Sequence, residues 1–215
     1  MRFASFALFL ALSLVSGCRD SSQDMSASVA AVETEASRHA LVLAPLIDPA
    51  KLDTLQGKRA ATPRLRKACY WLEMVRREGK DIETVISTAH ALTGPHRAER
   101  LKAQSDSLIR NVTILERLGS LDEAGMAKLR KGNAPTIMKG PYAGEIATAD
   151  HIIPRSVCEE LDERLYNLEF VPLTINQRKG AKIGQRQVDL ARRWHALGLL
   201  SKKGMEDVVS LYQLQ

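Results

Sequence analysis

Four residues of this sequence have types and spacing that could support chemistry: Asp150, His151, Asn167 and Asn176. The unperturbed pKa of histidine is about 6.5, so His151 is suited to take a proton from water near neutral pH. Asp150 and Asn176 offer hard oxygen ligands, which Mg²⁺ and Mn²⁺ prefer, and two ligands leave room for water and a phosphate. A base and a bound cation are what the hydrolysis of a phosphodiester requires.

These residues lie in three short stretches, 149–156 (ADHIIPRS), 167–173 (NLEFVPL) and 176–180 (NQRKG). His151 and Asn167 are 16 positions apart, and Asn167 and Asn176 are 9 apart. In residue types, order and spacing, the stretches resemble the HNH endonuclease family, also called His-Me finger or ββα-metal nucleases. The resemblance covers residues 140–184, under a quarter of the chain.

The resemblance implies a role for each residue. His151 would be the general base, and Asn167 belongs to the catalytic set because it would brace the loop between two strands and so orient the histidine. Asp150 and Asn176 would bind one Mg²⁺ or Mn²⁺ ion. The alternative is that Asp150 and His151 only make structural hydrogen bonds at a strand end. The match of Asn167 and Asn176 to the family pattern would then be a coincidence.

The sequence departs from the family pattern at two places. Thr148 stands where an acid is often found, two positions before the aspartate, and Val157-Cys158 stands where Gly-Gly is often found. A third carboxylate beside the metal is therefore missing from its usual position, and Glu145 is the candidate substitute.

Basic residues follow the third stretch, since residues 176–204 contain eight Lys or Arg and a single acid. The expected nucleic-acid contacts are Arg178, Lys179, Lys182 and Arg155. The formal net charge of +6 and a pI near 9.3 fit an anionic partner. With 5% aromatic residues, base stacking is not expected to be the main binding device. We expect contacts along a nucleic-acid backbone, DNA favoured over RNA, with little sequence preference and no small-molecule cofactor. Individually, these residues could equally be ordinary solvated side chains.

The surrounding pattern predicts an α+β fold that is mostly α. Apolar residues at three- and four-residue spacing predict helices near 63–78, 81–92, 96–118 and 121–131, the last with a capping box from Ser120 to Glu123. A Gly- and Pro-rich loop follows at 132–145. The order strand, strand, helix is then expected over 146–154, 168–173 and 174 onward, with a charged insert at 159–164. Two more helices are expected at 184–198 and 201–213.

The N-terminus has the layout of a secretory signal, with Arg2 before an apolar run too short to span a bilayer permanently. The run ends in Leu-Val-Ser-Gly-Cys at 14–18, which resembles the lipobox of bacterial lipoproteins. We expect a signal peptide at 1–17 and lipidation of Cys18, which would place the protein in the cell envelope outside the cytoplasm, on the periplasmic side or at the outer membrane if the host has two membranes. A plain signal peptide with an incidental cysteine is the alternative.

The remaining organisation follows from composition. The predicted segments are a flexible tether at 18–38, a helical region at 39–131 and a nuclease domain with C-terminal helices at 132–215. In the oxidising compartment that a secretory signal implies, Cys69 and Cys158 could form one disulfide or remain two isolated thiols, and the sequence leaves both open.

Three functions are compatible with these patterns. The leading hypothesis is a metal-dependent endonuclease anchored outside the cytoplasm. The second is a surface lipoprotein whose HNH unit is inactive and which binds nucleic acid through the basic helices. The third is a scaffold lipoprotein that recruits a partner through residues 40–131, a segment in which no motif identifies that partner.

Overall fold

A computed structural model describes residues 37–55 and 61–214. The predicted signal peptide, Cys18 and most of the predicted tether lie outside these residues. The tether was expected to reach residue 38, but residues 37–47 are helical, so its last two residues belong to a helix. Within the described ranges, no helix is both long enough and apolar enough to cross a membrane.

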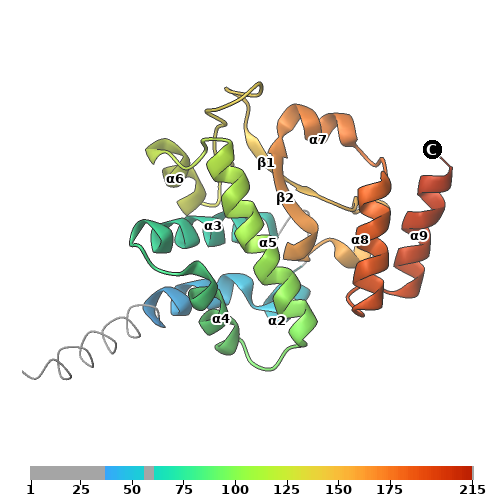
Figure 1. Cartoon of the computed structure of the whole chain (residues 1–215), viewed down its shortest axis with the longest axis horizontal. Helices are drawn as coiled ribbons and strands as arrows, with labels where there is room; N and C mark the ends of the chain where they lie inside the picture. The colour runs from blue at the N-terminus through green and yellow to red at the C-terminus, as the bar shows by residue number, and fades with distance from the viewer. Residues whose placement is uncertain (1–36, 56–60, 215) are drawn as a thin grey trace, which may run out of the picture. The chain divides into compact units, whose positions relative to one another are not determined.

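The described chain is mostly helical and has a small antiparallel sheet, which confirms the predicted α+β class dominated by helices (Figure 1). Besides the helical residues 37–47, the described helices are α2 (Pro49–Asp53), α3 (Ala61–Arg77), α4 (Ile82–Ala91), α5 (Ala98–Arg117), α6 (Glu123–Arg130), α7 (Leu173–Lys179), α8 (Gln185–Ala196) and α9 (Lys202–Gln213). The strands are β1 (Ala147–His151) and β2 (Leu168–Pro172), and two short 3-10 turns, Glu159–Leu161 and Leu165–Asn167, lie between them.

The start of α6 differs from the prediction. Its N-cap is Asp122, whose carboxylate accepts a hydrogen bond from the amide of Gly125 at 2.7 Å, so the expected capping box from Ser120 to Glu123 is wrong. Ser120 instead completes the end of α5, because its amide donates to the carbonyl of Leu115. A residue that closes one helix was mistaken for the start of the next.

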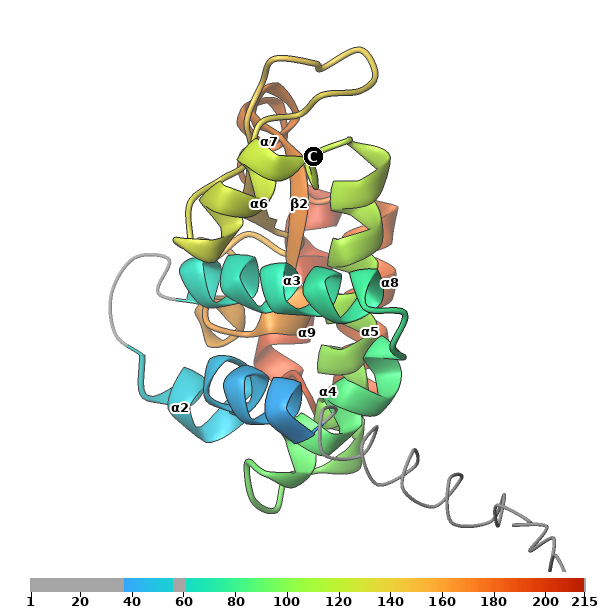
Figure 2. The ribbon, with the colours of Figure 1, turned by 90° about the vertical axis from the view of Figure 1, so that its left-hand side faces the viewer.

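One face of the two-stranded sheet packs on the helical region. Alternate residues of β1 and β2 are buried in the same hydrophobic cluster as α3, α4, α5 and α6, including Ala149 and Phe170. This cluster therefore joins residues on both sides of the predicted boundary at 131/132. Figure 2 shows α3 lying between the 132–146 loop and the pair α2 and α4. Because side chains alternate along a strand, the opposite face presents Asp150 and its cross-strand partner Glu169.

Helix α5 completes the hydrogen bonding of β2. The strand pairs with β1 along one edge, and its other edge meets the fully buried side chain of Asn111. The Asn111 amide nitrogen donates to the carbonyl of Leu168 at 3.0 Å, and its oxygen accepts from the amide of Phe170 at 2.9 Å. A single side chain thus takes the place that a third strand would fill.

Helices α8 and α9 form a second hydrophobic cluster with the segment between the two strands. Ile153 and Leu161 from that segment are buried in it, and the rings of Tyr166 and Trp194 meet edge to face at 5.1 Å between centroids. The Tyr166 hydroxyl also donates to the carbonyl of Leu199 at 3.0 Å. The C-terminal helices therefore support the segment between the strands.

The two cysteines of the described chain are free and buried, one in each cluster. Of the two possibilities that the sequence left open, the structure has two isolated thiols. Burial raises the pKa of both thiols, that of Cys158 to about 11, so both are protonated and unreactive near neutral pH.

A buried polar pair connects α4 and α5. The side-chain nitrogen of Gln104 donates to the carbonyl of Ile47 and lies 3.3 Å from Nε2 of His90. Because an amide nitrogen can only donate, Nε2 of His90 must accept, which requires a neutral ring. Burial, with the nearby His96 as a smaller cause, lowers the pKa of His90 to about 4.

Stability is therefore expected to decrease as the pH falls from about 6.5 to about 4. In this window the unfolded chain binds a proton at His90 that the folded protein excludes, so acid favours unfolding. His90→Gln keeps an acceptor for Gln104 but cannot titrate, and it should lose about 3 kcal/mol less than the wild type between pH 7 and pH 4. Urea unfolding across this range measures the difference, and equal losses in both proteins would contradict the prediction.

Candidate active site

Asp150 and His151 end β1, where the sheet opens into the segment 152–167. Asp150 faces Glu169 across the sheet, and His151 faces Leu168 in the last pair of the register. A strand that stops at this point leaves both side chains only partly buried, with 15% of each side chain exposed. The end of the strand therefore supplies a fixed base for two polar side chains that solvent can still reach.

Asn167 holds the segment between the strands, and its side chain is fully buried. Its oxygen accepts from the amide of Ile153 at 2.8 Å, and its nitrogen donates to the carbonyls of Ile153 and Leu161 at 3.0 and 3.2 Å. Its own carbonyl accepts from the amide of Ile152 at 2.7 Å. All these partners are main-chain groups, so Asn167 fixes the path of the chain immediately after His151.

His151 contacts Asp162, a residue that sequence reasoning did not single out. Nε2 of His151 lies 2.9 Å from the main-chain oxygen of Asp162 and 3.0 Å from its carboxylate oxygen Oδ1. Since the main-chain oxygen can only accept, Nε2 carries a proton in this contact, and in the neutral form of the ring the free lone pair is then on Nδ1. The free proton acceptor of the ring is therefore Nδ1.

The sequence carried only a partial signal for Asp162. It belongs to the charged insert at 159–164, which also contains Glu159, Glu160 and Glu163. The structure uses two of the glutamates elsewhere: Glu160 accepts from Ser201 at the start of α9, and Glu163 accepts from the amide of Ala61 at the start of α3. Only the folded path of the insert distinguishes Asp162 from these acids.

Asp150 and α7 meet through Lys179. The ammonium of Lys179 donates to Oδ2 of Asp150 at 2.6 Å and to the main-chain oxygen of His151 at 2.6 Å. Asn176 lies three positions before Lys179 on α7, and residues at this spacing share one face of a helix. Within residues 37–55 and 61–214, the side chain of Asn176 has no hydrogen bond, so its oxygen is available to a ligand.

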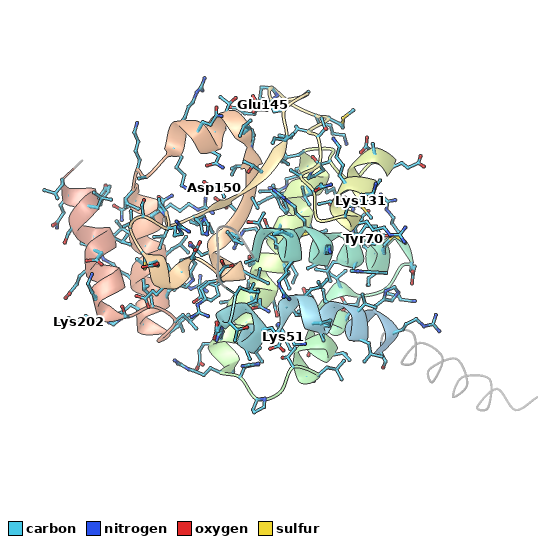
Figure 3. All side chains as sticks on the ribbon, turned by 180° about the vertical axis from the view of Figure 1, so that it is seen from behind. Lys51, Tyr70, Lys131, Glu145, Asp150 and Lys202 are labelled. Atoms are coloured by element: carbon cyan, nitrogen blue, oxygen red, sulfur yellow. The ribbon has the colours of Figure 1, made fainter. Side chains whose placement is uncertain are left out.

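Glu145 does not take the place of the missing carboxylate. Its two oxygens accept from the hydroxyl and the amide of Thr174 at 2.7 and 2.9 Å, which fixes the first turn of α7. These two hydrogen bonds lower the pKa of Glu145. Figure 3 shows Asp150 beneath α7, and Glu145 on the loop beside α7, well apart from Asp150. The carboxylate instead stabilises the helix that carries Asn176.

The basic residues divide into paired and unpaired groups. Arg186 pairs with Glu169 of β2, whereas Lys202 and Lys203 pair with acids one turn further along their own helix, α9. Figure 3 shows Lys202 on α9, away from Asp150. Arg155 lies 3.3 Å from the second carboxylate oxygen of Asp162 but keeps 46% of its side chain exposed. In the described part of the chain, the exposed side chains of Arg178, Lys182, Arg192 and Arg193 form no ion pair within 4.0 Å. The basic surface is therefore narrower than the sequence count indicates.

The donor set near Asp150 fits an ion that keeps most of its water. No group of three or more His, Cys, Asp or Glu side chains in the described chain is arranged to hold a metal ion. The carboxylate of Glu169, beside Asp150 on the sheet, is paired with Arg186. The remaining ligands are the carboxylate of Asp150 and the amide oxygen of Asn176, on the helix whose last residue contacts Asp150. Mg²⁺ commonly binds through one or two protein ligands with water and phosphate completing its shell, so these residues fit it if Lys179 moves away from Asp150.

Comparisons of the chain with protein-family models, with curated proteins and with solved structures found no match.

Proposed function

We propose that the chain is a metal-dependent endonuclease with a ββα-metal (HNH) site, which hydrolyses phosphodiester bonds in nucleic acid, DNA in preference to RNA, with little sequence preference. The main support is that the three motif stretches come together around one strand end. β1 ends at Asp150 and His151, Asn167 fixes the segment that follows, and α7 crosses back so that Lys179 contacts Asp150.

In this proposal the residues around His151 handle the proton. His151 takes a proton from the attacking water at Nδ1, because its Nε2 already donates to the main-chain oxygen of Asp162. The carboxylate of Asp162, 3.0 Å from Nε2, stabilises the positive charge that the ring then carries. Asp162 acts through the histidine and is a positioning residue, and Asn167 keeps the segment that carries it in place.

Asp150 and Asn176 would hold one Mg²⁺ or Mn²⁺ ion. When bound, the ion supplies positive charge against the non-bridging and leaving oxygens of the scissile phosphate. Arg178 and Lys182, exposed at the end of α7 and just beyond it, would contact neighbouring phosphates of the strand. Contacts to phosphates carry no base information, which agrees with the low sequence preference proposed.

The anchor completes the proposal. Lipidation of Cys18 would keep the enzyme at the cell envelope, outside the cytoplasm. Incorporation of labelled palmitate tests this, and the label should be lost in Cys18→Ser. Several acyl chains on one cysteine bury many CH₂ groups at about 0.8 kcal/mol each, so the attachment would be permanent on a cellular timescale.

A cleavage assay tests the enzyme directly. Residues 34–215 form one compact unit, so a fragment with these bounds should fold without the N-terminal segment. With Mg²⁺ or Mn²⁺ the fragment should cut plasmid and linear DNA, and it should cut RNA more slowly. EDTA should abolish this activity, and Asp150→Ala should reduce cleavage by about 10²-fold or more. Salt-sensitive binding without turnover would instead support the inactive, nucleic-acid-binding lipoprotein.

A further inference from the structure

We propose that Lys179 is a built-in cation that neutralises Asp150 in the metal-free protein and that a divalent ion must displace in order to bind. This inference rests on the proposed function, because it takes Asp150 as a metal ligand. It assigns Lys179 a role different from the simple phosphate contact that its position in the sequence suggested.

The contacts of the ammonium support this role. Lys179 Nζ lies 2.6 Å from Oδ2 of Asp150 and 2.6 Å from the main-chain oxygen of His151, two oxygens that converge at the end of β1. The side chains of Lys179 and Asp150 are only 20% and 15% exposed, so the charges are largely sheltered from solvent. An ammonium held by two converging oxygens occupies a place where a metal cation would also be favourable.

The divalent ion and the ammonium compete because both require the same carboxylate. An ion bound to Asp150 would lie within a few ångströms of an ammonium on the same carboxylate, and their charges would repel strongly in this sheltered position. Asn176 lies on the same face of α7 and has no hydrogen bond within the described ranges, so its oxygen could coordinate the ion. The ammonium, which is held by Asp150, gives Asn176 no comparable interaction. Of the two carboxylate oxygens of Asp150, Lys179 contacts only Oδ2, so the competition comes from the repulsion between the two cations, and we expect this repulsion to displace Lys179 when Asp150 and Asn176 share an ion.

Displacement is feasible because α7 has an attachment besides Lys179. Glu145 fixes the first turn of the helix through two hydrogen bonds to Thr174. Lys179 is the last residue of α7, and Gly180 follows with a positive φ of 53°. The four-carbon stem of a lysine can move its ammonium by several ångströms without moving the helix.

Metal binding without turnover tests the competition. Using the 34–215 fragment, we would measure Mn²⁺ affinity from the electron paramagnetic resonance signal of free Mn²⁺, for wild type, Lys179→Met and Asp150→Asn. The matched control is Lys182→Met, which removes an exposed charge three positions further on. Lys179→Met should bind Mn²⁺ about 5- to 150-fold more tightly than wild type, the range of ordinary coupling between two ligands, whereas Lys182→Met should change affinity far less.

A second readout separates displacement from a general effect of charge. The ¹⁵Nζ resonance of Lys179 can be assigned by its absence in Lys179→Met, and a saturating diamagnetic Mg²⁺ titration should move it towards the position of a solvated lysine. An unchanged resonance at Mg²⁺ concentrations that fill the site would overturn the proposal, as would equal Mn²⁺ affinities for Lys179→Met and Lys182→Met.

The failure of the proposed function gives a different result. If neither wild type nor Lys179→Met binds Mn²⁺ in an Asp150-dependent manner, the metal site itself is absent, and the proposed function fails together with this inference. If wild type cleaves DNA with metal while Lys179→Met shows no gain in affinity, the enzyme stands and only the competition is overturned. A thermal unfolding curve for each variant confirms that the measured chain is folded.

Discussion

Replacing His151 with alanine is expected to reduce cleavage by about 10²- to 10⁴-fold while the protein remains folded. In the proposed mechanism Nδ1 is the atom that takes a proton from water, because Nε2 is held at 2.9 Å from the main-chain oxygen of Asp162. No other histidine contacts Asp150 or Asp162 within the part of the chain that the structure describes. The expected loss is therefore in the chemical step and not in binding.

Single-turnover cleavage of a fluorescent duplex, at saturating Mn²⁺, measures this loss. His39→Ala is the matched control, since the ring of His39 pairs with Glu78 in the helical region. Its cleavage rate should stay within about twofold of wild type, because the substitution leaves the site and its charges unchanged. If His151→Ala retained more than a tenth of the wild-type rate, His151 would not be the base. Partial recovery on adding imidazole would indicate that proton transfer is what the substitution removed.

Replacing Asn167 with alanine is expected to lower the free energy of unfolding by about 3–5 kcal/mol. The fully buried side chain makes three hydrogen bonds to the main chain of Ile153 and Leu161, and alanine leaves all three main-chain groups without these partners. Each buried group left unpaired costs about 1–3 kcal/mol. The Leu161 carbonyl still accepts from the amide of Arg164, so the main cost comes from the two groups of Ile153, and the costs are not fully additive.

Urea unfolding measures the loss, with Asn133→Ala as a control in which the same substitution is made at an exposed position just after the turn that follows α6. The control should change the stability by less than about 0.5 kcal/mol. Cleavage should also fall in Asn167→Ala, because the released segment carries the Asp162 that orients His151. A stability loss equal to that of the control would show that the hydrogen bonds of Asn167 do not hold the segment.

Sequence patterns located most of the elements because these depend on local information. The helices α3, α4 and α5 lie within two residues of the ranges expected from apolar spacing and glycine stops, and β1 and β2 lie inside the two expected strands. The failure at Ser120 has a physical reason: its side chain and the glutamate three positions later satisfy the capping pattern, but its amide is already used to end α5. A pattern of residue types does not record which amides are already bonded.

The partners within the site were harder to predict because they depend on contacts between distant segments. The spacing of Asp150, Asn167 and Asn176 indicated the site, but nothing local indicated that Asp162 would reach His151 across 11 positions. Similarly, Arg186 is one of the eight basic residues counted in 176–204, but its guanidinium donates to both carboxylate oxygens of Glu169, at 2.7 and 2.6 Å. Ion pairs of this kind follow from the fold, so the net charge of a segment overstates the charge that it offers to a partner.

The hydrogen bonds of Asn111 to β2 have a consequence for how this hairpin could be reused. A side chain of α5 covers the open edge of β2, so the two strands cannot be transferred to another protein as an independent unit that begins at residue 132. Cut away from α5, it would present unpaired main-chain donors and acceptors to other copies of itself, which is the usual starting point for edge-to-edge aggregation. A graft into another scaffold would therefore need its own cover for that edge, in the form of a helix or a third strand.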